Sequence, residues 1–306
     1  MSLVHDAVDQ SGVAPMTLHI IALPDAPFGG LVSRWNPSQP LTPSQQDQVS
    51  TALGHYRVLV FRGQPQPTDD ELVMFAEQFG TPIKGSEWFR NSGAHPQILP
   101  VTNIADQDGI NLGVEGASSL EWHADYSYVS TPGHTSFLNA VELPDKPPRT
   151  YFCDMYRAFA TLDPQLQDQL RTLHAIHSIA DYMARPELEL AAKVRRDETR
   201  GIERPDIPEA EHPVVMIHPD TGQEILYVSK GITRRIIELE PTTSSALLKR
   251  LHLHATRPDA IYAHDWQVGD LVVFDTLGTM HRRDSWDPMQ RRLMRQLSTA
   301  CEVSTT

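Results

Sequence analysis

The chain has 306 residues, of which 40% are hydrophobic and 21% charged, and its formal net charge is −13. This acidic balance argues against a general nucleic-acid-binding protein, because such proteins normally need a basic surface. No apolar run approaches the roughly 20 residues of a membrane span, and the N-terminus lacks the pattern of a secretory signal. With only two cysteines, Cys153 and Cys301, a disulfide framework is excluded and a cytoplasmic protein is expected.

The first part of the chain predicts a helix, a strand and a second helix. Thr42 and Ser44 are typical of a helix start, and the β-branched residues of 57–61 indicate a strand directly after that helix. Further on, four apolar residues at helical spacing predict an amphipathic helix that stops at Gly80: Leu72, Phe75, Ala76 and Phe79. Between 83 and 120 the pattern weakens, apart from a possible strand at 98–104, and several glycines indicate a lid-like loop.

The second part of the chain is rich in strand signals. Segments 136–144 and 150–156 are interpreted as buried strands, and 164–179 as a helix with apolar residues on one face. The charged, proline-interrupted segment 184–212 is interpreted as an insertion with a short helix. A hairpin is predicted around Asp220-Thr221-Gly222, a helix at 244–254, and at least three strands follow. We therefore expect one domain over 1–306, mainly β with helical additions.

One short motif suggests metal chemistry. In the segment EWHADYSY, His123 and Asp125 are two residues apart, so an extended strand would present both side chains on the same face. A downstream histidine could complete a facial triad of two histidines and one carboxylate, which leaves open coordination positions on Fe(II). The best candidate is His281, which follows the strong strand signal LVVFD.

Two further residues could anchor a cosubstrate beside such a metal. A guanidinium pairs with a carboxylate through two parallel hydrogen bonds, and Arg292 follows His281 closely in a predicted strand. Thr150, at the start of another strand, could add a hydroxyl hydrogen bond. By contrast, the pairs His174/His177 and His252/His254 lie on predicted helices without a matched carboxylate, and Asp270 and Asp275 are better suited to hydrogen bonds at turns and strand ends.

With these residues, the sequence resembles the taurine dioxygenase and 2,4-dichlorophenoxyacetate dioxygenase family of Fe(II)- and 2-oxoglutarate-dependent enzymes. The resemblance covers most of the chain, in the family's order: YRVLVFRGQ, ELVMFAEQFG, WHADYSY, VELP with Thr150, HPVVMIHPDTG, GTMH and QRRLMR. It implies a double-stranded β-helix (jelly-roll) core. It also implies Fe(II) bound by His123, Asp125 and His281, and 2-oxoglutarate bound by Thr150 and Arg292, with O₂ as the oxidant.

Departures from the family pattern concern the substrate. Where taurine dioxygenase has an arginine that grips the substrate sulfonate, this chain has Gln296, and Ser119 replaces a substrate-contacting asparagine. Tyr126 and Tyr128 are candidate pocket walls, as are Trp122 and Phe274, and Arg295 is either a solvated charge or a substrate contact. Asp125 is retained, whereas halogenating relatives replace the carboxylate with a small residue, so halogenation is disfavoured.

The leading hypothesis is therefore an oxygenase that hydroxylates an aliphatic C–H bond of a small carboxylate, amino acid or natural-product intermediate, releasing succinate and CO₂. Desaturation or another oxidative rearrangement would use the same iron site. A hypothesis of another class is a non-catalytic sensor that binds metal or 2-oxoglutarate. The expected partner is a small molecule, without nucleic acid or membrane, and the family's habit implies a homodimer or homotetramer.

Overall fold

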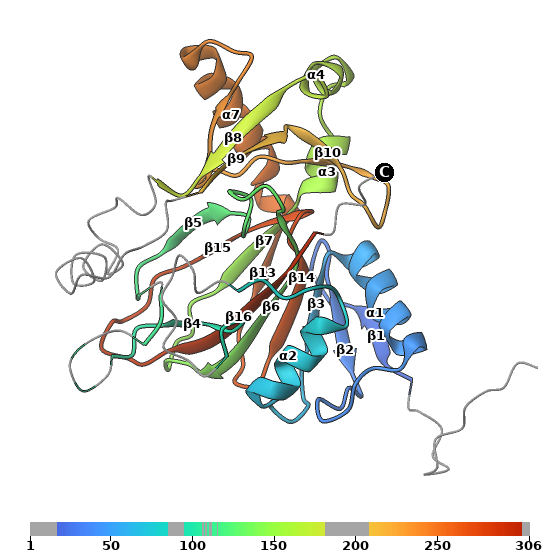
Figure 1. Cartoon of the computed structure of the whole chain (residues 1–306), viewed down its shortest axis with the longest axis vertical. Helices are drawn as coiled ribbons and strands as arrows, with labels where there is room; N and C mark the ends of the chain where they lie inside the picture. The colour runs from blue at the N-terminus through green and yellow to red at the C-terminus, as the bar shows by residue number, and fades with distance from the viewer. Residues whose placement is uncertain are drawn as a thin grey trace, which may run out of the picture.

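The computed structural model describes residues 17–84, 95–105, 107, 109, 112–114, 116–180 and 208–301. Within these residues the protein is mainly β, with helices on the outside of the sheets (Figure 1). The helices are α1 (Pro43–Tyr56), α2 (Asp69–Glu77), α3 (Met155–Ala160), α4 (Pro164–Leu170), α7 (Pro241–Ala255) and the short 3₁₀ helix η2 (Pro258–Ala260). The strands are β1 (His19–Ala22), β2 (Gly30–Ser33), β3 (Val58–Phe61), β4 (Leu99–Thr102), β5 (Leu120–His123), β6 (Gly133–Glu142), β7 (Thr150–Asp154), β8 (His174–Ser178), β9 (Glu209–Pro213), β10 (Val215–Ile217), β11 (Glu224–Leu226), β12 (Thr233–Ile236), β13 (Ile261–His264), β14 (Leu271–Asp275), β15 (Thr279–Arg283) and β16 (Leu293–Ala300).

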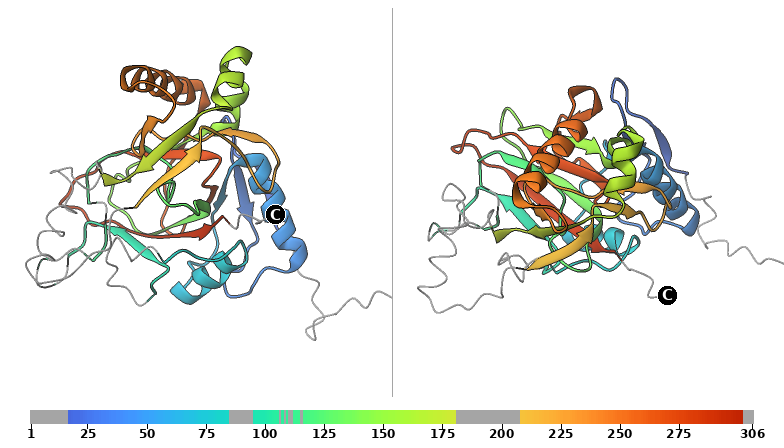
Figure 2. Two further views of the ribbon diagram at one scale, coloured as in Figure 1. Left: turned by 45° about the horizontal axis from the view of Figure 1, so that its top comes forward. Right: turned by 90° about the horizontal axis from the view of Figure 1, so that it is seen from above.

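Two sheets form the central part of the molecule. The larger has the order β1-β2-β3-β14-β6-β16-β4 and the smaller β13-β7-β15-β5, and neighbouring strands run antiparallel except for β2 and β3. One buried cluster joins the sheets, with Val60 and Met294 from the larger sheet and Phe152 and Tyr262 from the smaller. Apolar side chains of the two inner faces therefore form a common core. Figure 2 shows the strands of the two sheets from two further sides.

The predicted order of helix, strand and helix is confirmed by α1, β3 and α2. Both helices pack against the outer face of the larger sheet. Both begin with a capping box, in which Thr42 pairs with Gln45 and Thr68 with Glu71. Phe75 on α2 lies in an aromatic cluster with Phe61 of β3, their ring centroids 5.5 Å apart. The helices form because local capping and the burial of one apolar face favour the same segments.

The outer face of the smaller sheet is covered by α3, α4, α7 and the β8-β9-β12 sheet. Here the predicted helix 164–179 is correct only up to Leu170, because β8 follows at His174–Ser178. Strand β8 pairs with β9 on one side and β12 on the other, so both edges of its backbone find hydrogen-bond partners. Leu173 and Ile176 continue the helical spacing, but pairing with distant strands overrides it.

Other predictions are confirmed in the described residues. The hairpin β10–β11 turns through Gly222 at φ +66°, the helix expected at 244–254 forms as α7, and the C-terminal part forms β13 to β16. Residues 184–207 of the expected insertion lie outside the described residues, while β9 occupies its end. Part of the expected lid 83–120 also lies outside them, and the rest includes β4 at the edge of the larger sheet.

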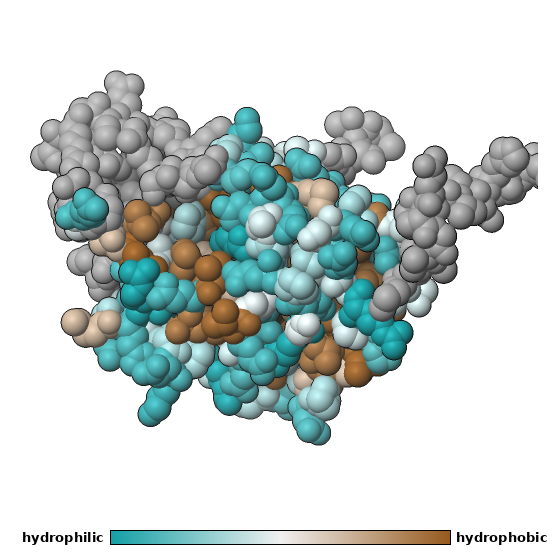
Figure 3. Space-filling model, turned by 90° about the horizontal axis from the view of Figure 1, so that it is seen from below, coloured by the Kyte–Doolittle hydropathy of each residue, from teal (hydrophilic) through white to brown (hydrophobic). Residues whose placement is uncertain are grey.

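No helix among the described residues is both long and apolar enough to cross a bilayer. One face of the molecule shows mostly hydrophilic residues with smaller hydrophobic areas between them (Figure 3).

Candidate active site

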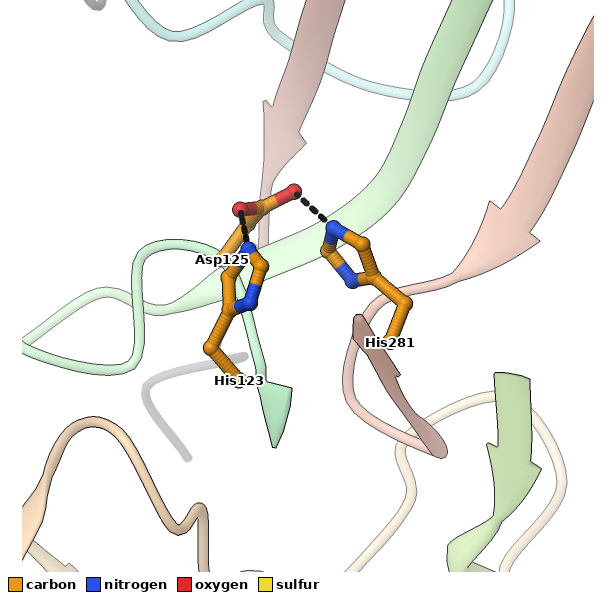
Figure 4. Close-up of side chains that lie close together, drawn as sticks. All are labelled: His123, Asp125 and His281. Atoms are coloured by element: carbon orange, nitrogen blue, oxygen red, sulfur yellow. Dashed lines mark ion pairs between the residues drawn. The ribbon is translucent and has the colours of Figure 1, made fainter. Parts of the chain in front are cut away.

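Pairing between two strands brings the predicted metal ligands together. Strands β5 and β15 are neighbours, and His123 lies directly opposite His281, with ring centroids 4.1 Å apart. Asp125 follows β5 in a turn; its carboxylate oxygens lie 3.7 Å from His123 Nε2 and 3.9 Å from His281 Nε2 (Figure 4). One ligand atom from each of the three residues lies within 4.8 Å of the others.

The structure differs in one respect from the geometry predicted for the His-x-Asp motif. Strand β5 ends at His123, so Asp125 does not share a continuous strand with it. Tyr126 has φ +55°, a left-handed conformation that reverses the chain immediately after Asp125. A tight turn, rather than strand alternation, therefore directs the carboxylate toward the two imidazoles.

Hydrogen bonds and burial prepare all three side chains to bind a cation. His123 Nδ1 lies 2.7 Å from the Glu121 carbonyl oxygen, so Nδ1–H donates and the lone pair stays on Nε2. Burial, with smaller effects from His123 and Arg283, holds the pKa of His281 well below its ordinary value, so its ring is neutral. Gln296 Nε2 donates to Asp125 Oδ2 at 2.7 Å. Two imidazoles and one carboxylate on one side of a pocket fit Fe(II) with open positions.

The two predicted cosubstrate residues line the same pocket as these three side chains. Arg292 is only 1% exposed, and its guanidinium lies 5.1 Å from the ring centre of Trp286. Thr150 accepts a hydrogen bond from Trp266 Nε1 at 2.9 Å, which leaves its own hydroxyl proton to donate. A buried guanidinium and an oriented hydroxyl beside the cation site fit the distal carboxylate of a dicarboxylic acid.

The predicted substrate residues separate into two groups. Tyr126, Tyr128 and Gln296 line the pocket, whereas Ser119 is exposed and is not among the described lining residues. Arg295 is directed elsewhere, since its guanidinium donates to Asp69 Oδ1 at 2.6 Å and to Asn139 Oδ1. Phe274 lines the pocket as expected. Trp122 instead belongs to the buried cluster on the far side of the smaller sheet.

Sequence reasoning missed Arg283, which also lines the pocket. Its guanidinium donates to the carbonyl oxygens of Gly116 and Ser118 and lies 4.6 Å from the Trp286 ring centre. Strand alternation was the available signal, because Arg283 is two residues beyond His281 and so shares its face. Trp266 and Trp286, which contact Thr150 and Arg292, had no such signal because each lies outside a regular strand.

Comparison with known proteins identifies the family of this chain. Residues 24–297 match the family model described as taurine catabolism dioxygenase TauD, TfdA family. The chain is 36% identical over 287 residues to pentalenolactone F synthase of Streptomyces arenae, covering 92% of this chain and 94% of that protein. It is 32% identical over 275 residues to (S)-phenoxypropionate/alpha-ketoglutarate-dioxygenase of Sphingobium herbicidovorans, covering 90% and 92%.

Solved structures show the same fold. A taurine dioxygenase from Burkholderia xenovorans aligns with a TM-score of 0.74 at 24% identity, over 94% of this chain and 91% of that chain. The structure of AAD-2 with Mn(II) and N-oxalylglycine aligns with a TM-score of 0.72 at 27% identity, over 95% and 100%. Fold, pocket and relatives together define the class, an Fe(II)- and 2-oxoglutarate-dependent dioxygenase that uses O₂. The chain belongs to the TauD, TfdA family.

Proposed function

We propose that His123, Asp125 and His281 bind the Fe(II) and that Arg292 and Thr150 hold the distal carboxylate of 2-oxoglutarate. The observation that carries this assignment is the convergence of the three ligand side chains within 4.8 Å, in a pocket that the two anchor residues also line. When bound, iron and 2-oxoglutarate would supply the electrons that activate O₂, and 2-oxoglutarate would be oxidised to succinate and CO₂.

The residues of the chain orient the metal ligands and the cosubstrate, and they exclude water from the pocket. The Glu121 carbonyl fixes the His123 ring, and Gln296 fixes Asp125 through Oδ2. Arg292 and Thr150 set the distance between the anchored carboxylate and the metal ligands. The remaining walls are largely apolar and exclude bulk water from the reacting carbon; they include Leu99, Val101, Val114, Leu138, Ile179 and Ile232.

The reaction we propose is hydroxylation of an aliphatic C–H bond in a small carboxylate, amino acid or natural-product intermediate. Of these, the pocket favours a natural-product intermediate that presents a hydrocarbon portion to the iron. Its walls are apolar, Gln296 offers no cation at the position of the taurine-binding arginine, and Arg295 is engaged with Asp69. The similarity to two proteins named pentalenolactone F synthase supports the same class.

A substrate screen tests this proposal. Succinate release is measured with hydrocarbon-rich natural-product intermediates, small amino acids, phenoxyacetates and taurine, each against a reaction without substrate. We expect stimulation by the first group and none by taurine. A gain of one oxygen in the product indicates hydroxylation, and a loss of two hydrogens indicates the alternative, desaturation. Stimulation by taurine alone would contradict the proposed substrate class.

The wider organisation of the protein is part of the same proposal. We infer a double-stranded β-helix core in a single domain over 1–306, since the two facing sheets share one apolar core and the family match spans 24–297. We also propose a lid at 83–120 and an insertion at 184–212. For the whole protein we propose a homodimeric or homotetrameric assembly and a cytoplasmic location.

A further inference from the structure

A second group of metal-ligating side chains lies apart from the active site. His134 is near the start of β6, and His218 and Asp220 lie in the β10–β11 hairpin. Each offers one ligand atom within 4.8 Å of the others, and among the described residues this is one of two such groups, the other being the iron site. His134 Nε2 lies 2.8 Å from Asp220 Oδ2, and the two imidazole rings are 5.7 Å apart.

Hydrogen bonds hold one nitrogen of each imidazole and turn the other toward Asp220. His218 Nε2 donates to Oδ1 of buried Asp275 at 3.3 Å, and Asp275 is itself fixed by the Tyr156 hydroxyl at 2.6 Å. His134 Nδ1 contacts the Thr135 hydroxyl at 3.0 Å. Metal-ligating histidines are usually oriented in this way, through the ring nitrogen that does not bind the metal.

The remaining nitrogens lie next to Asp220. His134 Nε2 faces the Asp220 carboxylate, and His218 Nδ1 accepts a hydrogen bond of 3.2 Å from the backbone N–H of Asp220, which a bound metal would replace. The side chain of His218 is 5% exposed, that of His134 18%, and that of Asp220 62%. The group is thus anchored in the protein on one side and reachable from solvent on the other.

We propose that His134, His218 and Asp220 form a second metal site, for a divalent transition metal of the Zn²⁺ type. Two imidazoles and one carboxylate are borderline ligands suited to Zn²⁺, with water in the remaining position. His134, His218 and Asp220 line a cavity of their own. Its described lining residues include no lysine or arginine to anchor a dicarboxylate, so the site is not a second oxygenase centre. Bound metal links the hairpin β10–β11 to β6 and stabilises the fold.

The experiment must separate this site from the iron site. A tag-free protein carrying His123→Ala and His281→Ala loses the first site, and its Zn²⁺ binding is measured by equilibrium dialysis, with thermal unfolding in parallel. We expect one equivalent of bound Zn²⁺ and a Zn²⁺-dependent rise in Tm. Adding Asp220→Asn, which keeps a hydrogen bond to His134 but weakens metal binding, is expected to lower the affinity at least tenfold and to remove the rise in Tm.

A matched control is available on β8. The His174 side chain is 45% exposed and its Nδ1 lies 2.9 Å from Glu238 Oε1, a histidine–carboxylate pair outside both metal groups. His174→Gln in the same background is expected to leave Zn²⁺ binding unchanged. The proposal is overturned if the background protein binds no Zn²⁺ at micromolar concentrations, or if Asp220→Asn and His174→Gln bind it equally well. In either case His134 and Asp220 form only a hydrogen-bonded pair, and the iron-site assignment is unaffected.

Discussion

At the scale of single residues, both carboxylate oxygens of Asp125 have close polar neighbours in the pocket. One oxygen faces His123, and the other faces His281 and accepts from Gln296. In the sulfonate-specific pattern an arginine at position 296 binds the substrate, whereas here a neutral amide donates a hydrogen bond to the proposed metal ligand. In the proposed iron site, Gln296 therefore acts through Asp125.

Replacing Gln296 with Leu removes this hydrogen bond while keeping the size of the side chain similar. Loss of such a hydrogen bond to a ligand costs roughly 10–100-fold in metal affinity, and we expect weakening in that range. Anaerobic Fe(II) titration measures it, with Gln169→Leu on the exposed face of α4 as the control. Equal Fe(II) affinity in the two variants would show that Gln296 does not support Asp125.

Arg292→Ala is predicted to impair 2-oxoglutarate binding while iron binding is kept. Truncating one partner of a buried charge pair costs about 2–5 kcal/mol, so we expect the 2-oxoglutarate concentration for half-saturation to rise roughly 30-fold or more. Its neighbour Arg291 is exposed and pairs with Glu142 at 2.8 Å, which makes Arg291→Ala a matched control. If both substitutions raise the half-saturating 2-oxoglutarate concentration by a similar, small factor, Arg292 does not bind the cosubstrate.

At the scale of elements, the capping box of α1 is a local stabilising feature that can be tested. Gln45 N–H donates to Thr42 Oγ1, and the Thr42 N–H donates to the Gln45 side chain at 2.9 Å. Thr42→Ala is expected to lower the free energy of unfolding by about 1 kcal/mol, measured by urea denaturation. Thr51→Ala, on the exposed surface of the same helix, should change it by less than about 0.5 kcal/mol. An inverted order would contradict the capping role.

Elements with strong local signals were predictable from the sequence. Helices α1 and α2 have capping residues and one apolar face, and the β10–β11 hairpin has Gly222 at its turn, so short-range patterns were enough. Strand β8 was not predictable, because its pairing with β9 and β12 depends on residues far away in the sequence. Local periodicity cannot show which distant strand will supply backbone partners.

The difference between local patterns and long-range contacts also explains which features of the candidate site could be predicted. His123, Asp125, His281, Thr150 and Arg292 were identified because their spacing and order carry a family pattern. The turn at Tyr126, the support from Gln296 and the diversion of Arg295 toward Asp69 depend on tertiary contacts. The direction of a side chain at the edge of a pocket therefore required the structure.

At the scale of the whole molecule, buried histidines make stability depend on pH. Burial, together with nearby His212, lowers the pKa of His177 to about 3, and burial lowers that of His252 to about 4, from an ordinary value of 6.5. These rings are neutral in the folded protein, whereas the unfolded chain takes up protons below about pH 6.5. The unfolded state thus binds more protons in this window, and stability falls as the pH falls.

Each such group contributes a slope of up to about 1.4 kcal/mol per pH unit. Urea unfolding at pH 7.5, 6 and 5 should therefore show a decreasing free energy of unfolding. His177→Gln is expected to flatten this dependence, while His19→Gln at the exposed edge strand β1 leaves it unchanged. An unaltered slope in the His177 variant would show that this ring does not take part.

The central claim is that three side chains from β5, the turn after it and β15 hold one Fe(II) next to the 2-oxoglutarate anchors. Anaerobic titration of the protein with Fe(II) and 2-oxoglutarate tests it most directly, through the visible metal-to-ligand charge-transfer band. We predict that the intact protein develops the band and that His123→Ala and Asp125→Ala each abolish it, together with succinate release on admission of O₂. If either variant retains both the band and succinate formation, the assignment of that ligand is wrong.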